Sequence, residues 1–202
     1  MRPAHHAATA CEHRTITTWP VPTLRTRRLV LTPLAAEDAE AMVEVLADER
    51  MYEFTGGDPP TLDRLRQRYR AMARGRSPSG DEWWFNWIVR WPADPIGVVQ
   101  ATVTADRSQA DVAWEVGVPW QGQGIAGEAA QAMVDWLLHA GVSTVRACIH
   151  PEHAASAAIA ARIGLAPWEE RIDGEVVWVS TAPERSVRSA RPESPNQAKA
   201  GG

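Results

Sequence analysis

The sequence predicts a single α/β domain of three layers, in which a mixed sheet of six to seven strands carries helices on both faces. The chain has 202 residues, enough for one ordinary domain but not for two. Its composition is 45% hydrophobic and 23% charged, as in soluble globular proteins, which excludes a disordered or low-complexity chain. Strand-like and helix-like segments follow in the order strand, two helices, three strands, helix, strand, helix, hairpin, and this order is typical of a mixed sheet covered by helices.

The domain is expected to begin with one strand and two helices. An apolar run within residues 27–34 predicts the strand, and apolar residues at helical spacing predict a helix over 36–47. A second helix is predicted from 61 to about 73, because Thr61 is a suitable N-cap and an acidic residue follows in the first turn.

Three strands follow, over residues 84–90, 96–104 and 111–118, with a Pro-Ala-Asp-Pro turn between the first two. The third strand alternates most clearly. Its two faces are Val112, Trp114, Val116 and Val118 on one side, and Asp111, Ala113, Glu115 and Gly117 on the other.

The remaining elements complete the sheet. A helix is predicted from about 124 to 140, with Gly141 as its stop, and a strand over 142–149. A further helix over about 152–163 precedes two short strands that flank the hairpin turn Asp173-Gly174.

The ordered domain is predicted to span residues 19–180. Residues 1–18 show no apolar period and are expected to form a disordered arm, and the proline-rich residues 181–202 a disordered tail. Net charge is −4 at pH 7, so no positive field favours nucleic acid, and no apolar run or signal segment favours a membrane or secretion. Cys11 and Cys148 cannot form a disulfide framework, and we expect a cytoplasmic protein.

The most informative segment joins the third of these strands to the next helix through Gln121, Gly122, Gln123 and Gly124. A helix start offers unpaired N–H groups and a positive dipole end, and glycines let a phosphate approach the backbone. The turn is therefore a candidate anion site, although such a turn is also found as a simple tight connection. It is neither a P-loop nor a full dinucleotide fingerprint.

This segment resembles the phosphate loop Gln/Arg-x-x-Gly-x-Gly/Ala of the GNAT superfamily of acyl-CoA-dependent N-acyltransferases, in the form Gln121-Gly-Gln-Gly124-Ile-Ala126. A second match, His153-Ala-Ala-Ser156 followed by Ile163-Gly164-Leu165, is similar to the family's helix beside the pantetheine arm. The opening from Leu29 to Asp38 resembles the branch that contains ribosomal-protein N-acetyltransferases. The resemblance implies acetyl-CoA as co-substrate and no metal. The implied cofactor-binding residues are Val116, Gly117, Val118, Gln121, Gly122, Gln123, Gly124, Ile125, Ala126, His153 and Ser156.

Two positions depart from the family pattern. His153 stands where the family has asparagine, and Ala160 stands where many relatives have a tyrosine acid. Ser156 is therefore the candidate for protonating or hydrogen-bonding the departing thiolate, the alternative being that it only caps or packs within its helix.

The reaction implied by the resemblance is direct attack of an amine on the thioester, whose oxygen would be bound by a backbone N–H within residues 116–118. The amine must lose a proton, and Glu115 is the first choice for the base, with Asp111 second. The alternative for either is a solvated strand carboxylate.

The acceptor is expected to be a primary amine, on a small molecule or a protein N-terminus. Trp84 and Asn86, within an aromatic cluster, are candidate acceptor-binding residues, although most of the cluster is expected in the core. The protein is expected to be a monomer or homodimer. The alternative function is a non-catalytic acyl-CoA-binding sensor or interaction domain.

Overall fold

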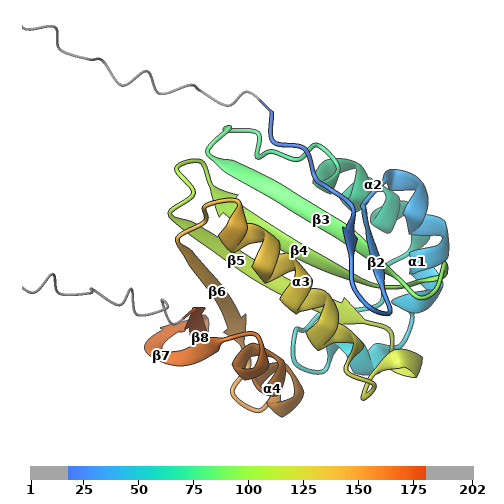
Figure 1. Ribbon diagram of the computed structural model, residues 1–202. Coiled ribbons are helices and arrows are strands. Elements are labelled where there is room, and N and C mark those ends of the chain that lie inside the picture. The colour runs from blue at the N-terminus through green and yellow to red at the C-terminus, as the bar shows by residue number, and fades with distance from the viewer. Residues whose placement is uncertain (1–17, 181–202) are drawn as a thin grey trace, which may run out of the picture.

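The computed structural model describes residues 18–180, which fold around one mixed sheet (Figure 1). The sheet has eight strands in the order β1-β2-β3-β4-β5-β6-β8-β7, of which only the pair β5–β6 is parallel. The strands are β1 (Leu24–Arg25), β2 (Val30–Pro33), β3 (Glu82–Arg90), β4 (Pro95–Thr104), β5 (Gln109–Val116), β6 (Thr144–Ile149), β7 (Leu165–Ile172) and β8 (Glu175–Ser180).

This architecture confirms the predicted α/β fold, but the sheet is larger than the six to seven strands expected. The additional strand is β1, which pairs with β2 over two residues only. So short a strand has no alternation from which it could be recognised.

Four α-helices cover the sheet: α1 (Ala39–Val45), α2 (Leu62–Met72), α3 (Ile125–His139) and α4 (Ala154–Arg162). Figure 1 shows α3 lying across one face of the sheet, with α4 beside it at the β6–β8 end. The first helix starts later than predicted because residues 36–38 form a 3₁₀ turn, in which the Asp38 carboxylate accepts a hydrogen bond from the Ala35 N–H.

The core lies on both faces of the sheet. Under α3 it contains Phe85 and Trp87, both fully buried, and the rings of Trp19 and Trp136 pack against them. Under α1 and α2 the buried residues include Met42, Leu65, Tyr69, Ile88 and Val98. Most of the aromatic cluster of β3 is thus in the core.

The strand predicted over 111–118 ends at Val116 instead. Gly117 begins a 3₁₀ turn, Val118–Trp120, whose second residue is Pro119. A proline cannot donate to a sheet ladder, and the chain therefore leaves the sheet at this point.

The two parallel strands separate where β5 continues toward Val116. Their pairing covers only Gln109 to Asp111 on β5 and Thr144 to Arg146 on β6. Beyond these residues the strands diverge, so the sheet opens between Val112 and Val116 on one side and the end of β6 on the other. This opening positions the site described below.

The expectations for residues 1–17 and 181–202, and for Cys11, lie outside the described residues. Within residues 18–180, no helix combines the length and apolar character that would be needed to cross a membrane.

Candidate active site

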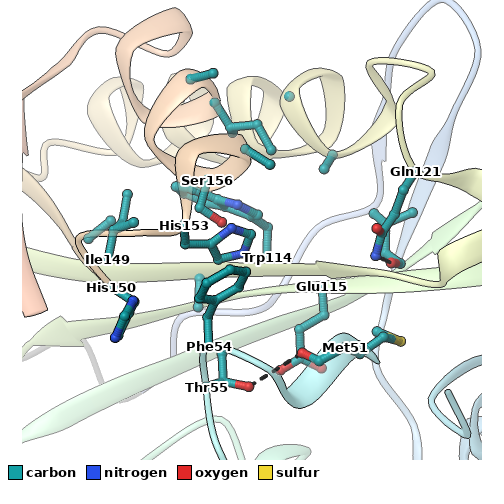
Figure 2. A pocket seen from close by; sticks show the side chains of 18 of the residues that line it. Met51, Phe54, Thr55, Trp114, Glu115, Gln121, Ile149, His150, His153 and Ser156 are labelled. Atoms are coloured by element: carbon teal, nitrogen blue, oxygen red, sulfur yellow. Dashed lines mark hydrogen bonds between the residues drawn. The ribbon is translucent and has the colours of Figure 1, made fainter. Parts of the chain in front are cut away.

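A cavity of about 460 Å³ fills the opening between β5 and β6 (Figure 2). Its wall comes from seven parts of the chain: residues 51–55 between α1 and α2, β5, the loop 120–124, the start of α3, the end of β6 with the turn after it, α4, and Glu175 of β8. Concave sites of this size, apolar with a few polar groups, are typical binding sites for small molecules.

The predicted phosphate loop lies at one end of the cavity. Gly124 adopts φ of +73° directly before α3, a left-handed conformation that glycine adopts without strain. The Gln121 side chain folds back, and its Nε2 donates to the Val116 carbonyl over 2.9 Å. The start of α3, whose first N–H groups have no partner within the helix, lines this end of the cavity, and such a helix start is suited to an anion.

Two guanidinium groups from distant segments lie beside this loop. A Cβ placed on Gly124 would be 3.7 Å from Arg28 Nη2 and 3.8 Å from Arg162 Nη1. Arg28 is fixed by Glu128, at 2.6 Å, and donates to the Gln123 carbonyl over 3.1 Å. The Arg162 guanidinium forms no hydrogen bond or ion pair with any residue in 18–180, so its charge is available to an anion.

The backbone of β5 contributes donors to the opening. The Gly117 N–H already donates to the Ile96 carbonyl of β4 over 2.9 Å. Alternate amides of an antiparallel strand point to opposite sides. The amides of Trp114 and Val116 therefore point away from β4, toward the gap that β6 leaves. Of residues 116–118, Val116 is thus the one whose N–H is directed into the cavity.

His153 and Ser156, at the start of α4, line the cavity wall opposite β5. The His153 ring stacks on Phe54, with ring centroids 4.5 Å apart and planes at 18°. Burial, and secondly the neighbouring His150, lower the pKa of His153 below its usual value. The imidazole is therefore neutral at pH 7 and can donate or accept a hydrogen bond.

The two candidate carboxylates of β5 are in different environments. Glu115 lines the cavity, near Met51 and Thr55 and away from Ser156 in Figure 2. Its carboxylate forms no hydrogen bond or ion pair with another described residue. Asp111 lies outside the lining and pairs with Arg146 over 2.9 Å. Glu115 alone of the two is thus free to meet a ligand.

Other sequence-predicted residues lie outside the cavity lining. Gly117, Val118 and Gln123 do not line the cavity, whereas Gly122, Gly124, Ile125 and Ala126 do. Trp84 and Asn86 are not brought to the cavity. The Trp84 indole donates to Glu82, and the buried Asn86 amide donates to the Met72 carbonyl of α2. Their part in acceptor binding stays a prediction.

Several residues at the site were not identified from the sequence, because no motif or periodicity marks them. The segment 51–55, with Met51 and Phe54, reads as a connection, and Glu175 reads as the start of a hairpin strand. Arg162 of the lining, and Arg28 beside the loop, were two among twenty arginines. Only the fold brings these residues together. Among residues 18–180, no group of three metal-ligating side chains is close enough to hold a metal ion.

Comparison with known proteins adds to this geometry. The family described as an acetyltransferase (GNAT) domain matches residues 28–166, more than half of the chain. No curated protein has a significant sequence match to the chain.

Solved structures resemble the whole described domain. An acetyltransferase from Agrobacterium tumefaciens has a TM-score of 0.63 at 27% identity, covering 81% of this chain and 96% of that one. RimL, a ribosomal α-N-protein acetyltransferase in complex with coenzyme A, has a TM-score of 0.66 at 15% identity, covering 80% and 98%. The microcin C7 self-immunity acetyltransferase MccE, in complex with acetyl-CoA and AMP, has a TM-score of 0.65 at 14% identity, covering 77% and 93%. At 14% and 15% identity, the similarity to MccE and RimL shows a shared fold alone.

Proposed function

The chain belongs to the GNAT acetyltransferase family, and on that premise we propose that it transfers an acetyl group from acetyl-CoA to a primary amine. The observation that carries the proposal is the cavity between the separated strands β5 and β6. It joins an anion site at one end to an unpaired carboxylate, Glu115, in the same wall. The acceptor is a small-molecule amine or a protein N-terminus.

The loop end of the cavity suits the phosphates of coenzyme A. The pyrophosphate is held by the backbone amides of Gly122 to Ala126, with the positive end of the α3 dipole behind them. Arg28 and Arg162 add positive charge at the same point. The neighbouring structures that hold coenzyme A or acetyl-CoA support this assignment.

We place the acyl end of the co-substrate in the part of the cavity between β5 and β6. His153 and Ser156 line it from α4 and can hydrogen-bond the pantetheine arm and the sulfur. The Val116 N–H, directed toward the gap, is the donor for the thioester oxygen. A fixed donor there stabilises the negative charge that develops on this oxygen when the amine attacks.

The amine must be neutral to attack. At pH 7 an α-amine with a pKa of ~7.7–8.0 is roughly 10–20% neutral, whereas a lysine amine at ~10.4 is under 0.1% neutral. Glu115 is the general base that removes this proton, directly or through a water molecule. Ser156 donates a proton or a hydrogen bond to the departing thiolate, since Ala160 supplies no hydroxyl.

The substitution Glu115→Gln tests this mechanism, because the amide keeps the size of the side chain but takes up no proton at neutral pH. We expect kcat at pH 7 to fall by ~10²–10⁴ while the KM for acetyl-CoA barely changes. Raising the pH recovers much of the loss, since more amine arrives already neutral. Steady-state kinetics between pH 6 and 9 measure both effects.

The matched control is Asp111→Asn, which makes the same chemical change on the same face of β5, outside the cavity. It is expected to cost less than tenfold in kcat, a margin of about 1.4 kcal/mol. Parent-like kinetics of Glu115→Gln throughout this pH range would remove Glu115 from the mechanism. The other carboxylate of the lining, Glu175, would then be the next candidate.

A further inference from the structure

Tyr69 has a buried hydroxyl group that the mechanism above does not use. The side chain lies on α2 and is 1% exposed, packed in the core cluster between α1, α2 and the sheet. Among buried side-chain atoms of residues 18–180, its hydroxyl oxygen is the one without a hydrogen-bond partner. Buried polar groups in native proteins are nearly always satisfied, by protein or by an ordered water molecule, so this exception requires an explanation.

The sheet face that Tyr69 covers is the face that carries Glu115. Val98 of β4 belongs to the same core cluster as Tyr69, and it is the register partner of Glu115 on β5. Directly opposed residues of an antiparallel pair point to the same side of the sheet. Glu115 therefore projects beside the cluster, at its boundary with the cavity.

The electrostatics agree with this placement. Burial, and secondly the negative charge of Glu115, raise the pKa of Tyr69 above its usual value. The other charged or titratable groups that act on this hydroxyl are Arg68 of α2, Asp38 and Tyr52. Asp38 is paired with Arg90 over 2.5 Å, and Arg68 is exposed. The Glu115 carboxylate is thus the unpaired acceptor in the neighbourhood of the Tyr69 hydroxyl within the described chain.

Tyr52 provides a contrast in the same region. Its pKa is also raised, by burial first and by Glu115 second, so it too lies within the influence of that carboxylate. Its hydroxyl, however, donates to the Leu46 carbonyl over 2.9 Å. The Tyr52 hydroxyl therefore donates to the backbone, whereas the Tyr69 hydroxyl is still available as a donor.

We propose that Tyr69 is a positioning residue for Glu115, its hydroxyl donating through a buried water molecule that in turn donates to the carboxylate. The proposal rests on the role of Glu115 in the proposed function. Such a bridge satisfies the buried hydroxyl and stabilises the ionised form of the carboxylate, which is the form a general base requires. It also occupies one face of the carboxylate from the core side, leaving the cavity side for the amine.

A titration without substrate tests the bridge. Carboxyl carbons of glutamate side chains are followed by ¹³C NMR as a function of pH, and the resonance lost in Glu115→Gln identifies Glu115. In Tyr69→Phe, which keeps the ring, we expect the titration midpoint of that resonance to move up by about one pH unit, because a donor to the charged form is lost. The acidic limb of the kcat/KM profile should move in the same direction.

Tyr52→Phe is the matched control, since it removes a hydroxyl from the same region but one that the Leu46 carbonyl engages. Its Glu115 midpoint should equal that of the parent. A parent-like midpoint in folded Tyr69→Phe overturns the proposal, as does an equal shift in Tyr52→Phe. Failure of the proposed function is a separate result: the parent would then acetylate no amine, whatever the titration shows.

Discussion

At the scale of single residues, Gly124 is the position in the proposed phosphate loop where a substitution is most informative. Its φ of +73° favours glycine, and the two guanidinium groups of Arg28 and Arg162 lie within 4 Å of the place a Cβ would take. A negatively charged side chain here would occupy the proposed phosphate site and could pair with both arginines.

We predict that Gly124→Asp weakens coenzyme A binding by at least tenfold, or about 1.4 kcal/mol, with the fold retained. Titration calorimetry measures the affinity. Gly124→Asn is the matched control, because asparagine has nearly the same shape and adopts left-handed backbone conformations comparatively easily. It introduces no charge and should bind coenzyme A more tightly than the aspartate variant. Equal affinities in the two variants would show that the charge at this position does not matter.

The sequence was sufficient to identify the loop, but it did not identify the residues that surround the loop in the fold. Gln121 to Gly124 are contiguous, and their spacing between a strand and a helix identifies them. Arg28, in the turn before β2, and Arg162, at the end of α4, lie beside Gly124 only in the folded chain. Phe54 likewise reaches His153 across the cavity, and no local pattern predicts a ring stack between segments so far apart.

At the scale of secondary-structure elements, Glu128 ties the start of α3 to the turn between β1 and β2. Its carboxylate accepts hydrogen bonds from the Thr26 hydroxyl and from Arg28, both at 2.6 Å. Burial by itself raises the pKa of Glu128, but these hydrogen bonds outweigh it and hold the pKa below its usual value. Ionised Glu128 therefore stabilises the folded state.

The sign of the pH dependence follows from that lowered pKa. The stabilisation is fully present above the unfolded-state pKa of about 4.3, and it is lost as the pH falls through the lower folded-state value. Glu128→Gln should therefore lower the thermal midpoint at pH 7, and its difference from the parent should shrink below about pH 4. Thermal unfolding followed by circular dichroism between pH 3 and 7 measures this.

The control is Glu40→Gln, because the Glu40 side chain is 69% exposed and pairs with Arg66 on the surface. Exposed pairs contribute only about 0–1 kcal/mol, so this variant should differ little from the parent at any pH. If the difference between Glu128→Gln and the parent stayed constant down to pH 3, the ionised carboxylate would not be the stabilising species.

Elements were predictable where their pattern was long. The helix α3 and the strands β3 and β4 have enough residues for their periodicity to stand out, and their bounds agree within about two residues. The existence of β1 and the end of β5 depend instead on contacts and turns that no periodicity shows. β1 exists because it pairs with β2, and β5 ends at Val116 because Gly117 and Pro119 turn the chain out of the sheet.

At the scale of the whole molecule, the separation of β5 from β6 organises the site. One opening in the sheet gives a single cavity access to the start of α3, to α4 and to the segment 51–55. Positive charge gathers at the loop end, and Glu115 and Glu175 are the carboxylates of the lining. This separation of charge suits the proposed function, in which an anionic co-substrate and a cationic acceptor occupy the cavity together. The order of the elements along the chain was predictable from the sequence, and the family resemblance indicated an acyl site at residues 116–118. The order of the strands within the sheet and the short extent of the β5–β6 pairing depend on tertiary contacts and were not predicted.

The most direct test of the proposed acetyl transfer is the release of thiol from acetyl-CoA, measured across a panel of primary amines that includes peptide N-termini. We predict amine-dependent release, with one acetyl group found on the acceptor nitrogen by mass spectrometry, and loss of the signal in Glu115→Gln. Tight binding of coenzyme A with no amine-dependent release from any acceptor would contradict the enzymatic assignment. That result would instead support an acyl-CoA-binding sensor built on the same fold.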